Sequence, residues 1–428
     1  MVPFTYHSNI LHAESVPVPK IAQIHGSPFY LYSQTGIENS LSIYQNAFGK
    51  TKNRIFYAVK ACSNLSILKL LHDMGSYFDV VSTGELYRVA QVTGSIKKCI
   101  FSGVGKSMEA LEYSISNNIH CINVESMAEL DRIIQITNRL KLSVNISFRI
   151  NPNIDAKSHP YISTGLDENK FGISLTNALT AYKYSMTQDF LNIIGLSCHI
   201  GSQIKDLSVF SECTLKVLEF HKQLIKNNIE LEFIDFGGGL GICYESDEQA
   251  LIKEYVEIIL SHLPDNFSSY IYIEPGRSIV GKNGILVTRV EYIKENVQNY
   301  FAVVDAAMND LIRPTLYNSK HRIVPVNNLV LKANKTYQIV GPVCETSDTF
   351  SKSFERQVQQ NDLLAILDVG AYGATMSSHY NTRPNIPEVL VKNNTFRLIR
   401  KHQSIDSILQ EELDCLKTTV TTDIIKQA

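Results

Sequence analysis

Short apolar runs alternate with longer amphipathic stretches between about residue 55 and residue 280. The runs are rich in β-branched and aromatic residues, as strands are, and the stretches between them repeat apolar residues at helical spacing. Strand-like runs lie at 55–60, 78–82, 99–103, 120–125, 142–150, 193–201, 231–239 and 270–276. Eight such βα repeats favour an α/β fold of the (β/α)8 or TIM-barrel type over an open, doubly wound sheet.

Beyond residue 280 the pattern changes to strand-like pieces with few helices between them. These pieces lie at 284–295, 300–308, 321–327, 336–343, 363–372 and 387–400. The change predicts a C-terminal, mainly β domain of Greek-key or β-barrel type. We expect a barrel over 28–280 and a second domain made of 1–27 together with 281–428. The polar tail from Ser404 predicts a terminal helix or a solvated end.

Length and charge narrow the class of protein. The chain has 428 residues, more than a single hydrophobic core usually serves, which agrees with two domains. Its formal net charge of -2 gives no electrostatic reason to expect nucleic acid or a membrane surface as a partner. No apolar run approaches the roughly 20 residues that span a bilayer. We therefore expect a cytoplasmic protein that binds a small molecule.

The eight cysteines are scattered and form no C-x-x-C pair. Such spacing predicts neither a zinc site nor a disulfide framework, and we expect no bound metal. Most of the thiols are expected to be reduced and packed in the core.

Polar residues gather where the strand-like runs end. Lys60, Ser82, His199, the glycines 237–239 and Glu274 all stand at the carboxyl ends of their runs. In a (β/α)8 barrel these ends form the face that carries catalytic groups. A lysine at a strand end is by itself most often a solvated charge, so its chemistry depends on its neighbours.

Two neighbouring motifs supply that context. In DFGGGLGI, the backbone N–H groups of Gly237, Gly238 and Gly239 can cradle a phosphate, although a glycine run can also be a plain turn. It matches neither G-x-G-x-x-G nor a P-loop. In IEPGRSI, Glu274 is either a solvated cap, half of a surface pair with Arg277, or the partner of a protonated ring nitrogen. A phosphate site, a lysine and a carboxylate together fit pyridoxal 5'-phosphate.

The chain also resembles a known family, the fold-type III pyridoxal-phosphate decarboxylases, and within it the diaminopimelate decarboxylases. The resemblance covers nearly the whole chain and has no departure at a motif position. It rests on segments that stand in the family's order, namely FYAVKA, VVSTGEL, NPNIDAKSHPYISTGLDENKFGI, CHIGSQI, DFGGGLGI, EPGRSIV, IRPTLY, GPVCETSD and DVGAYGATMSSHYNTRP. Any one of these segments would be weak alone, but their joint occurrence is highly specific.

The resemblance implies cofactor-binding roles for a set of residues. Lys60 would join the cofactor's aldehyde, which requires a neutral amine, and His199 would pack against its ring. Glu274 would keep the pyridine nitrogen protonated, so that the ring can accept electrons. Ser202 and the glycines Gly237, Gly238 and Gly239 would hold the phosphate, with Tyr372 closing on it. Gly276 and Arg277 complete the implied cofactor-binding set.

Further residues are implied to act on the substrate. Cys344 would donate the proton that replaces carbon dioxide, and a thiol suits this because its pKa near 8.5 is close to neutrality. By itself, however, an isolated cysteine is more often a small buried hydrophobe. The family's homodimer shares its active sites, with Cys344, Glu345 and Tyr372 of the mainly β domain completing the other chain's barrel.

The implied reaction is the decarboxylation of meso-2,6-diaminopimelate to L-lysine, the last step of lysine biosynthesis. The substrate's distal end carries an ammonium and a carboxylate, which call for an acid and a base together. Glu345 would bind the ammonium, while the carboxylate and its surroundings would be held by Arg277, Arg313, Tyr317 and Tyr372.

Three alternatives stay open at this point. An ornithine or arginine decarboxylase shares the barrel, the lysine and EPGR, but it needs no arginine for a distal carboxylate. An alanine racemase pairs the ring nitrogen with arginine, which disfavours it here because Glu274 occupies that position. A non-catalytic pyridoxal-phosphate-binding homologue, of the antizyme-inhibitor kind, would be expected to lack catalytic groups such as Lys60 and Cys344.

Overall fold

The computed structural model describes residues 2–155, 164–165, 169–329 and 332–417. The chain folds into two compact units. The first unit holds Ser33–Gly284 and Asp368–Thr375, and the second holds Phe4–Tyr32, Ile285–Leu367 and the chain from Met376 onward. A short segment late in the sequence therefore folds back into the first unit.

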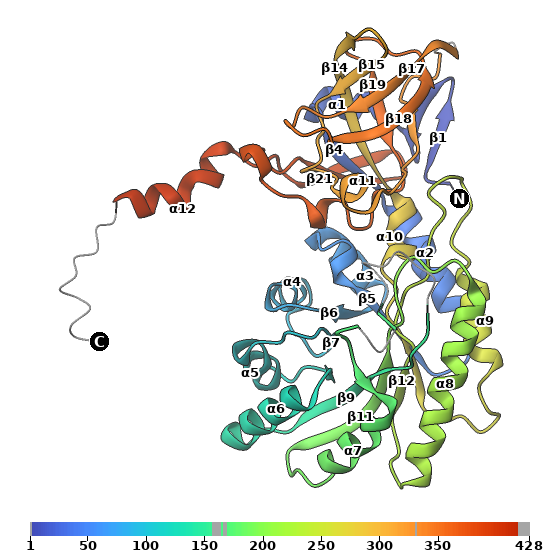
Figure 1. The fold of residues 1–428 in the computed structure, drawn as a ribbon, viewed down its shortest axis with the longest axis vertical. Helices are drawn as coiled ribbons and strands as arrows, with labels where there is room; N and C mark the ends of the chain where they lie inside the picture. Colours follow the sequence, from blue (N-terminus) through green and yellow to red (C-terminus); the bar gives the residue numbers. More distant parts are fainter. Residues whose placement is uncertain (1, 156–163, 166–168, 330–331, 418–428) are drawn as a thin grey trace. The chain divides into compact units, whose positions relative to one another are not determined.

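The first unit is a closed barrel of parallel strands (Figure 1). Its strands are β5 (Asn53–Ala58), β6 (Tyr77–Val80), β7 (Cys99–Phe101), β8 (Cys121–Val124), β9 (Val144–Asn151), β11 (Leu191–Cys198), β12 (Phe233–Asp235) and β13 (Tyr270–Ile273). Each strand pairs in parallel with the next, and β13 closes the ring on β5 with Ile271 opposite Asn53. All eight strand-like runs of the sequence are barrel strands, so the predicted (β/α)8 fold is confirmed.

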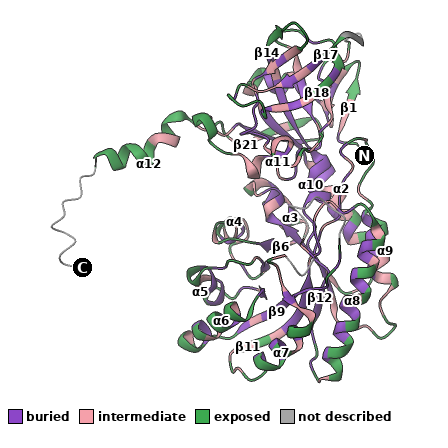
Figure 2. Ribbon diagram, in the orientation of Figure 1, coloured by how far each residue is buried: buried purple, intermediate pink, exposed green. Residues whose placement is uncertain are grey.

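Helices follow the strands and cover the outside of the barrel. They are α2 (Gln34–Ala47), α3 (Leu65–Asp73), α4 (Thr83–Thr93), α5 (Met108–Ser116), α6 (Met127–Leu140), α7 (Leu175–Ser185), α8 (Leu207–Lys226) and α9 (Ile252–Ser261), with the short β10 (Ile173–Ser174) before α7 and α10 (Arg277–Val280) after β13. Figure 2 shows the strands buried and the outward helix faces exposed. This is the arrangement expected when each helix turns an apolar stripe toward the sheet.

Serine residues fix where several of these helices begin. The hydroxyl of Ser82 accepts a hydrogen bond from the Glu85 backbone N–H at 3.2 Å, and the Glu85 carboxylate accepts one from the Val81 N–H at 2.8 Å. This reciprocal pair is a variant of the capping box in which the glutamate accepts from the residue before the cap, and Ser126 with Glu129 forms another at the start of α6. Ser82 thus stands at the barrel face as predicted, where it serves as a helix cap.

The second unit is built on a mixed β-sheet. Its strands are β1 (Phe4–His7), β2 (Ile10–Ala13), β3 (Val16–Pro17), β4 (Phe29–Ser33), β14 (Gly284–Glu295), β15 (Tyr300–Val304), β16 (Ile323–Pro325), β17 (Lys332–Val340), β18 (Thr349–Arg356), β19 (Leu363–Ile366), β20 (Glu388–Lys392) and β21 (Thr395–Arg400). The first three form a small sheet of their own, and the long path runs β18-β17-β15-β14-β4-β20-β21. The predicted mainly β second domain is confirmed.

The helices of the second unit are few. They are α1 (Val18–His25), α11 (Arg313–Tyr317) and α12 (Ile405–Lys417). Its core includes Phe29, Leu31, Val287 and Val389, which join β4, β14 and β20. The predicted tail after Ser404 is the helix α12, none of whose residues is buried. In the described part of the chain, no helix is both long and apolar enough to cross a membrane.

Candidate active site

A cavity of about 420 Å³ opens at the carboxyl ends of the barrel strands. Its walls carry Lys60, Ser102, Arg149, His199 and Glu274, which come from five different strand ends. Residues far apart in the sequence meet here because parallel strands end on one face of the barrel. The position and the charged lining make this cavity the candidate active site.

Lys60 lies in the single helical turn η1 (Val59–Ala61) directly after β5. Its ammonium donates a hydrogen bond to the carboxylate of Asp79, at the end of β6, over 2.7 Å. Burial acts to lower the pKa of Lys60, but the Asp79 and Glu274 carboxylates outweigh it and raise that pKa. In the cofactor-free protein the two carboxylates therefore favour the ammonium form of Lys60, and the neutral amine that binding of an aldehyde requires stays a prediction.

Two acidic side chains, Asp79 and Glu274, act on this lysine, and a third, Asp235, lies beside Glu274. Burial raises the pKa of Asp235 from 3.8 to about 7. Burial, with Asp235 and Asp79 as neighbours, raises the pKa of Glu274 well above its usual value. The cluster of Asp79, Asp235 and Glu274 thus carries more potential negative charge than Lys60 balances. Such a cluster favours the binding of a cation beside Glu274.

His199 follows β11 and is kept neutral. Burial lowers its pKa well below 6.5, and the positive charges of Arg149 and Lys60 lower it further. Its Nδ1 accepts a hydrogen bond from the Gly238 backbone N–H at 3.1 Å, which leaves the proton on Nε2. A neutral imidazole whose orientation is fixed by backbone is suited to packing against a flat ring.

The glycine turn after β12 needs its glycines for backbone packing. Gly237 has a φ of +67°, and a Cβ at Gly238 would lie 2.2 Å from the Glu274 carbonyl oxygen. The turn therefore runs directly against the Glu274 strand end. Any larger residue would push the two strand ends apart.

Arg277, at the start of α10, completes this corner of the barrel mouth. Its guanidinium donates to the Ser202 hydroxyl at 3.0 Å and to the Tyr244 hydroxyl at 2.5 Å, and it lies 4.6 Å from the centre of the Tyr372 ring. Its Nε is buried and has no hydrogen-bond partner among the described residues. A buried, unpaired donor beside a serine and a glycine turn fits an anionic ligand.

Tyr372 departs from the prediction in one respect. It was expected to act from the mainly β domain of the other chain, but the structure groups it with the first unit of its own chain. Its backbone N–H donates to the Ala61 carbonyl at 2.8 Å, next to Lys60. The chain returns here after β19, which no periodicity in the sequence reveals.

The second unit holds the other predicted residues. Arg313 is buried at the start of α11, its guanidinium 5.5 Å from the centre of the Tyr317 ring. Cys344 is exposed, and Glu345 follows it on the loop between β17 and β18. The Thr315 hydroxyl of α11 donates to the Ser347 carbonyl at 2.9 Å, so α11 and this loop are joined.

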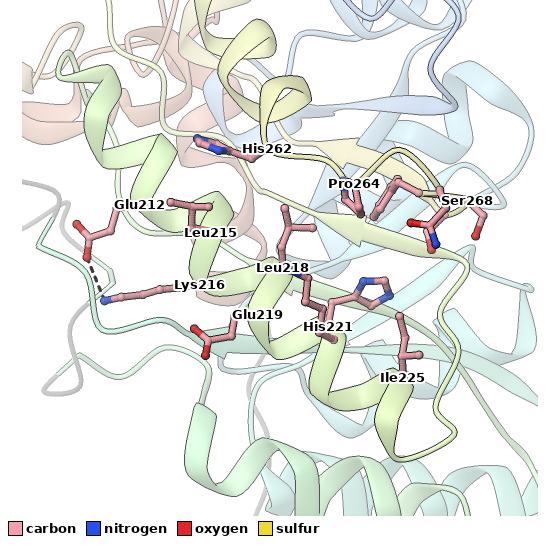
Figure 3. A pocket seen from close by; sticks show the side chains of 14 residues that line it. Glu212, Leu215, Lys216, Leu218, Glu219, His221, Ile225, His262, Pro264 and Ser268 are labelled. Carbon is pink, nitrogen blue, oxygen red and sulfur yellow. Dashed lines mark ion pairs between the residues drawn. The ribbon is translucent and has the colours of Figure 1, made fainter.

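A larger hollow, of about 920 Å³, lies on the outer wall of the barrel between α8 and the segment that leads into β13 (Figure 3). Its charged side chains stand along one face of α8, where Glu212 and Lys216 form an ion pair at 3.1 Å. Of the two histidines that line it, His221 has a pKa lowered by burial alone. The hollow lacks the buried acid cluster of the barrel mouth, so we do not assign the chemistry to it.

Comparison with known proteins decides the family. Residues 34–281 match the model of the pyridoxal-binding domain of pyridoxal-dependent decarboxylases. The chain is 44% identical to diaminopimelate decarboxylase from Neisseria meningitidis serogroup A, over 95% of this chain and 100% of the relative. The chain belongs to the diaminopimelate decarboxylase family.

Solved structures of this family share the fold. Helicobacter pylori diaminopimelate decarboxylase, crystallised with L-lysine, superposes with a TM-score of 0.88 at 42% identity and covers 93% of this chain and 100% of its own. The enzyme from M. jannaschii has a TM-score of 0.90 at 35% identity, with 98% of each chain covered. The family's pyridoxal-binding barrel is thus the first unit described above.

The barrel mouth fits the cofactor of the diaminopimelate decarboxylase family. The unpaired Nε of Arg277 suits the phosphate, and the surplus acid around Glu274 suits a protonated pyridine nitrogen. Lys60 has the amine that can bind the aldehyde, and the neutral His199 can pack on the ring. The predicted residues that the structure brings together in this unit are Lys60, His199, Ser202, Gly237, Gly238, Gly239, Glu274, Gly276, Arg277 and Tyr372.

Other buried groups at this mouth escaped the sequence analysis. Asp79 and Asp235 are fully buried within strand ends, and Arg149 pairs with Glu125 at 2.8 Å. A charged residue inside an apolar, strand-like run was the signal that could have found them. The family segment at 151–173 was also predicted, but residues 156–163 and 166–168 of it lie outside the described residues.

Proposed function

We propose that this chain decarboxylates meso-2,6-diaminopimelate at its D-configured end to give L-lysine and carbon dioxide, the last step of lysine biosynthesis. The observation that carries the proposal is that α11 and the loop between β17 and β18, which are joined by a hydrogen bond, carry charges of opposite sign. Glu345 offers a carboxylate for the distal ammonium, and Arg313 with Tyr317 offers a guanidinium and a hydroxyl for the distal carboxylate. The H. pylori relative, which was crystallised with L-lysine, supports this assignment.

The residues of the chain divide the chemistry between them. Pyridoxal 5'-phosphate supplies the electron sink that stabilises the charge left when carbon dioxide departs. Lys60 would hold the cofactor at its aldehyde, and Asp79, which accepts a hydrogen bond from the Lys60 amine at 2.7 Å, would orient that amine. Glu274 would keep the pyridine nitrogen protonated, and Cys344 would deliver the proton that replaces carbon dioxide.

We further propose a homodimer with shared active sites. Exposed apolar side chains support a partner at the barrel mouth, because helix starts and strand ends there carry Leu65, Val81, Val104, Met108 and Met127, each at least 37% exposed. In this dimer Cys344 and Glu345 of one chain would complete the barrel of the other. Mixing inactive Lys60→Ala with inactive Cys344→Ala chains should restore activity, because one of the hybrid sites keeps both residues.

The domain roles follow from this assignment. We assign cofactor binding to the barrel, predicted over 28–280, and substrate recognition and oligomer contacts to the domain predicted over 1–27 and 281–428. A cytoplasmic location is part of the proposal. All eight cysteines are free, including Cys198 and Cys213, whose sulfur atoms lie 3.5 Å apart without a bond, which suits a reducing compartment.

A substrate panel tests the proposal. The cofactor-loaded protein should release carbon dioxide from meso-diaminopimelate and far more slowly from ornithine, arginine and lysine, because those substrates leave the arginine of the site unpaired. Arg313→Ala should lower kcat/KM for diaminopimelate by about 10²-fold or more and leave the cofactor absorption intact. Preference for ornithine or arginine would show a different decarboxylase, and colour without turnover would show a non-catalytic homologue.

A further inference from the structure

The loop that carries Cys344 and Glu345 is held rigidly by one buried carboxylate. Asp348 is 2% exposed and accepts hydrogen bonds from the backbone N–H groups of Met308 at 2.7 Å and Val343 at 2.8 Å. A Cβ at Gly341 would lie 2.3 Å from this carboxylate. The loop therefore closes tightly around Asp348, and the side chains of Cys344 and Glu345 are left to project from it.

Glu345 itself is exposed, yet its carboxylate is fixed at both oxygens. The Ser347 hydroxyl donates to Oε2 at 3.0 Å, and the Tyr380 hydroxyl donates to Oε1. Hydrogen bonds from Tyr380 and then Ser347 lower the pKa of Glu345, and the same contact raises the pKa of Tyr380. An exposed glutamate normally samples many rotamers, whereas two donors keep this one ionised and in a single orientation.

Tyr380 can hold Glu345 because its own segment is anchored. The preceding Ser378 donates its backbone N–H to the Asn309 carbonyl at 3.0 Å. The following Arg383 donates to the Asn309 side chain at 2.8 Å and to the Asp305 carbonyl at 2.6 Å. Tyr380 thus stands between two fixed points of the second unit, although its side chain is 45% exposed.

We propose that Tyr380 is a positioning residue for substrate specificity, whose hydroxyl aims the Glu345 carboxylate at the distal ammonium of the substrate. This inference rests on the proposed function and deepens it. A carboxylate that is already ionised and oriented loses little freedom when the ammonium binds, so the contact adds to affinity and to discrimination. The contribution belongs to substrate binding, because the distal centre takes no part in bond breaking.

The test compares two substrates that differ only at the distal centre. For Tyr380→Phe we expect KM for meso-diaminopimelate to rise roughly 10-fold while kcat changes less than about two-fold, as for loss of one hydrogen bond to a charged group. KM for D-2-aminopimelate, which lacks the distal amino group, should be the same in the variant and the wild type. The acid limb of 1/KM for diaminopimelate should also move to higher pH, since Glu345 loses the donor that lowers its pKa.

Two further variants complete the design. Tyr292→Phe, at a tyrosine on β14 that is 62% exposed, is the matched control and should change nothing. In Glu345→Gln the added Tyr380→Phe change should have no further effect on diaminopimelate, because the two residues act as a unit. Unchanged KM, an equal rise for both substrates, or independent effects of the two changes would each overturn the role of Tyr380. A wild-type enzyme that does not turn over diaminopimelate would overturn the proposed function as well.

Discussion

At the carboxyl ends of its strands the barrel buries Asp79 and Glu274 beside the half-buried Lys60, whereas at the amino ends it packs Arg54 among aromatic rings. Arg54 lies 5.0 Å from the ring centres of both Tyr77 and Tyr270 and donates to the Tyr272 hydroxyl at 2.9 Å. At the same end of the barrel, the Phe233 ring stacks on the Tyr272 ring with ring centres 4.1 Å apart. We call this aromatic end the floor of the barrel and the other end its mouth.

The two ends differ in how far their buried polar atoms are satisfied. At the mouth, Asp79 Oδ1, Asp235 Oδ2, Ser197 Oγ and Arg277 Nε are buried without a hydrogen-bond partner. At the floor, the polar groups among the aromatic rings are paired with one another, since Arg54 donates to Tyr272 at 2.9 Å and lies 3.2 Å from the His120 ring nitrogen. Unpaired buried groups cost stability, so they indicate places where a ligand is expected to supply the partner. The mouth is therefore arranged for binding and the floor for stability.

The sharpest test of this contrast is Lys60→Ala. We expect loss of the visible cofactor absorption and a fall in kcat of at least about 10³-fold, because among the described residues Lys60 is the one lysine that lines the cavity. Lys52→Ala changes an exposed lysine beside the floor and should keep both properties. A borohydride-reducible cofactor linkage at another lysine of the Lys60→Ala protein, with turnover retained, would contradict the assignment.

The converse change is Phe233→Ala at the floor. Removal of this fully buried ring should lower the free energy of unfolding by about 3–5 kcal/mol, since a cavity remains between β11, β12 and β13. The kcat per folded molecule should stay within about two-fold of the wild type. Urea denaturation gives the first quantity and activity at saturating cofactor gives the second. Leu215→Ala, at a half-exposed leucine on α8, should cost far less stability.

The same contrast explains what the sequence could predict of the fold. The barrel strands are buried on both faces, so they appear as apolar runs that composition alone detects. The strand β18 was missed because only Phe350 and Phe354 of its residues are buried and the others are largely polar. Its place in the sheet comes from pairing with β17, which is a tertiary interaction without a local signal.

For the candidate site, the sequence predicted which residues take part but not the contacts between them. Lys60, His199 and Glu274 could be placed because strand ends converge in a barrel and because their motifs resemble a known family. The ion pair of Lys60 could not be predicted, since its partner Asp79 comes from another strand. The bond between Tyr380 and Glu345 was equally hidden, because it joins two loops 35 residues apart.

Glu274→Gln probes the electrostatics of the mouth with a smaller expected effect. The amide keeps the shape of the side chain but cannot hold a positive charge on the ring nitrogen. We expect the cofactor to bind, as its absorption would report, while kcat falls on the order of 10²-fold. The control is Glu109→Gln on the surface of α5, which should leave kcat and the cofactor absorption unchanged. Full activity of Glu274→Gln would contradict the role of this carboxylate.

The smallest expected effect is a pair of opposite pH dependences. At the floor, burial and then the charge of Arg54 lower the pKa of His120 from 6.5 to about 4. Between these values the unfolded chain binds a proton that the folded chain does not, so His120 contributes stability that is complete above pH 6.5 and is lost as the pH falls toward 4. At the mouth, burial raises the pKa of Asp235 from 3.8 to about 7, so its contribution falls as the pH rises through that window.

Each contribution can be removed by one substitution. Relative to the wild type, His120→Asn should gain stability as the pH is lowered from 6.5 to 5, by at most about 1.4 kcal/mol per pH unit, because the asparagine has no proton to take up. Asp235→Asn should gain relative stability in the opposite direction, as the pH is raised from 5 to 6.5. Urea denaturation of the three cofactor-free proteins at both pH values measures the two slopes. If the stability difference from the wild type changed with pH in the same direction for both variants, the opposite pKa shifts assigned to His120 and Asp235 would be wrong.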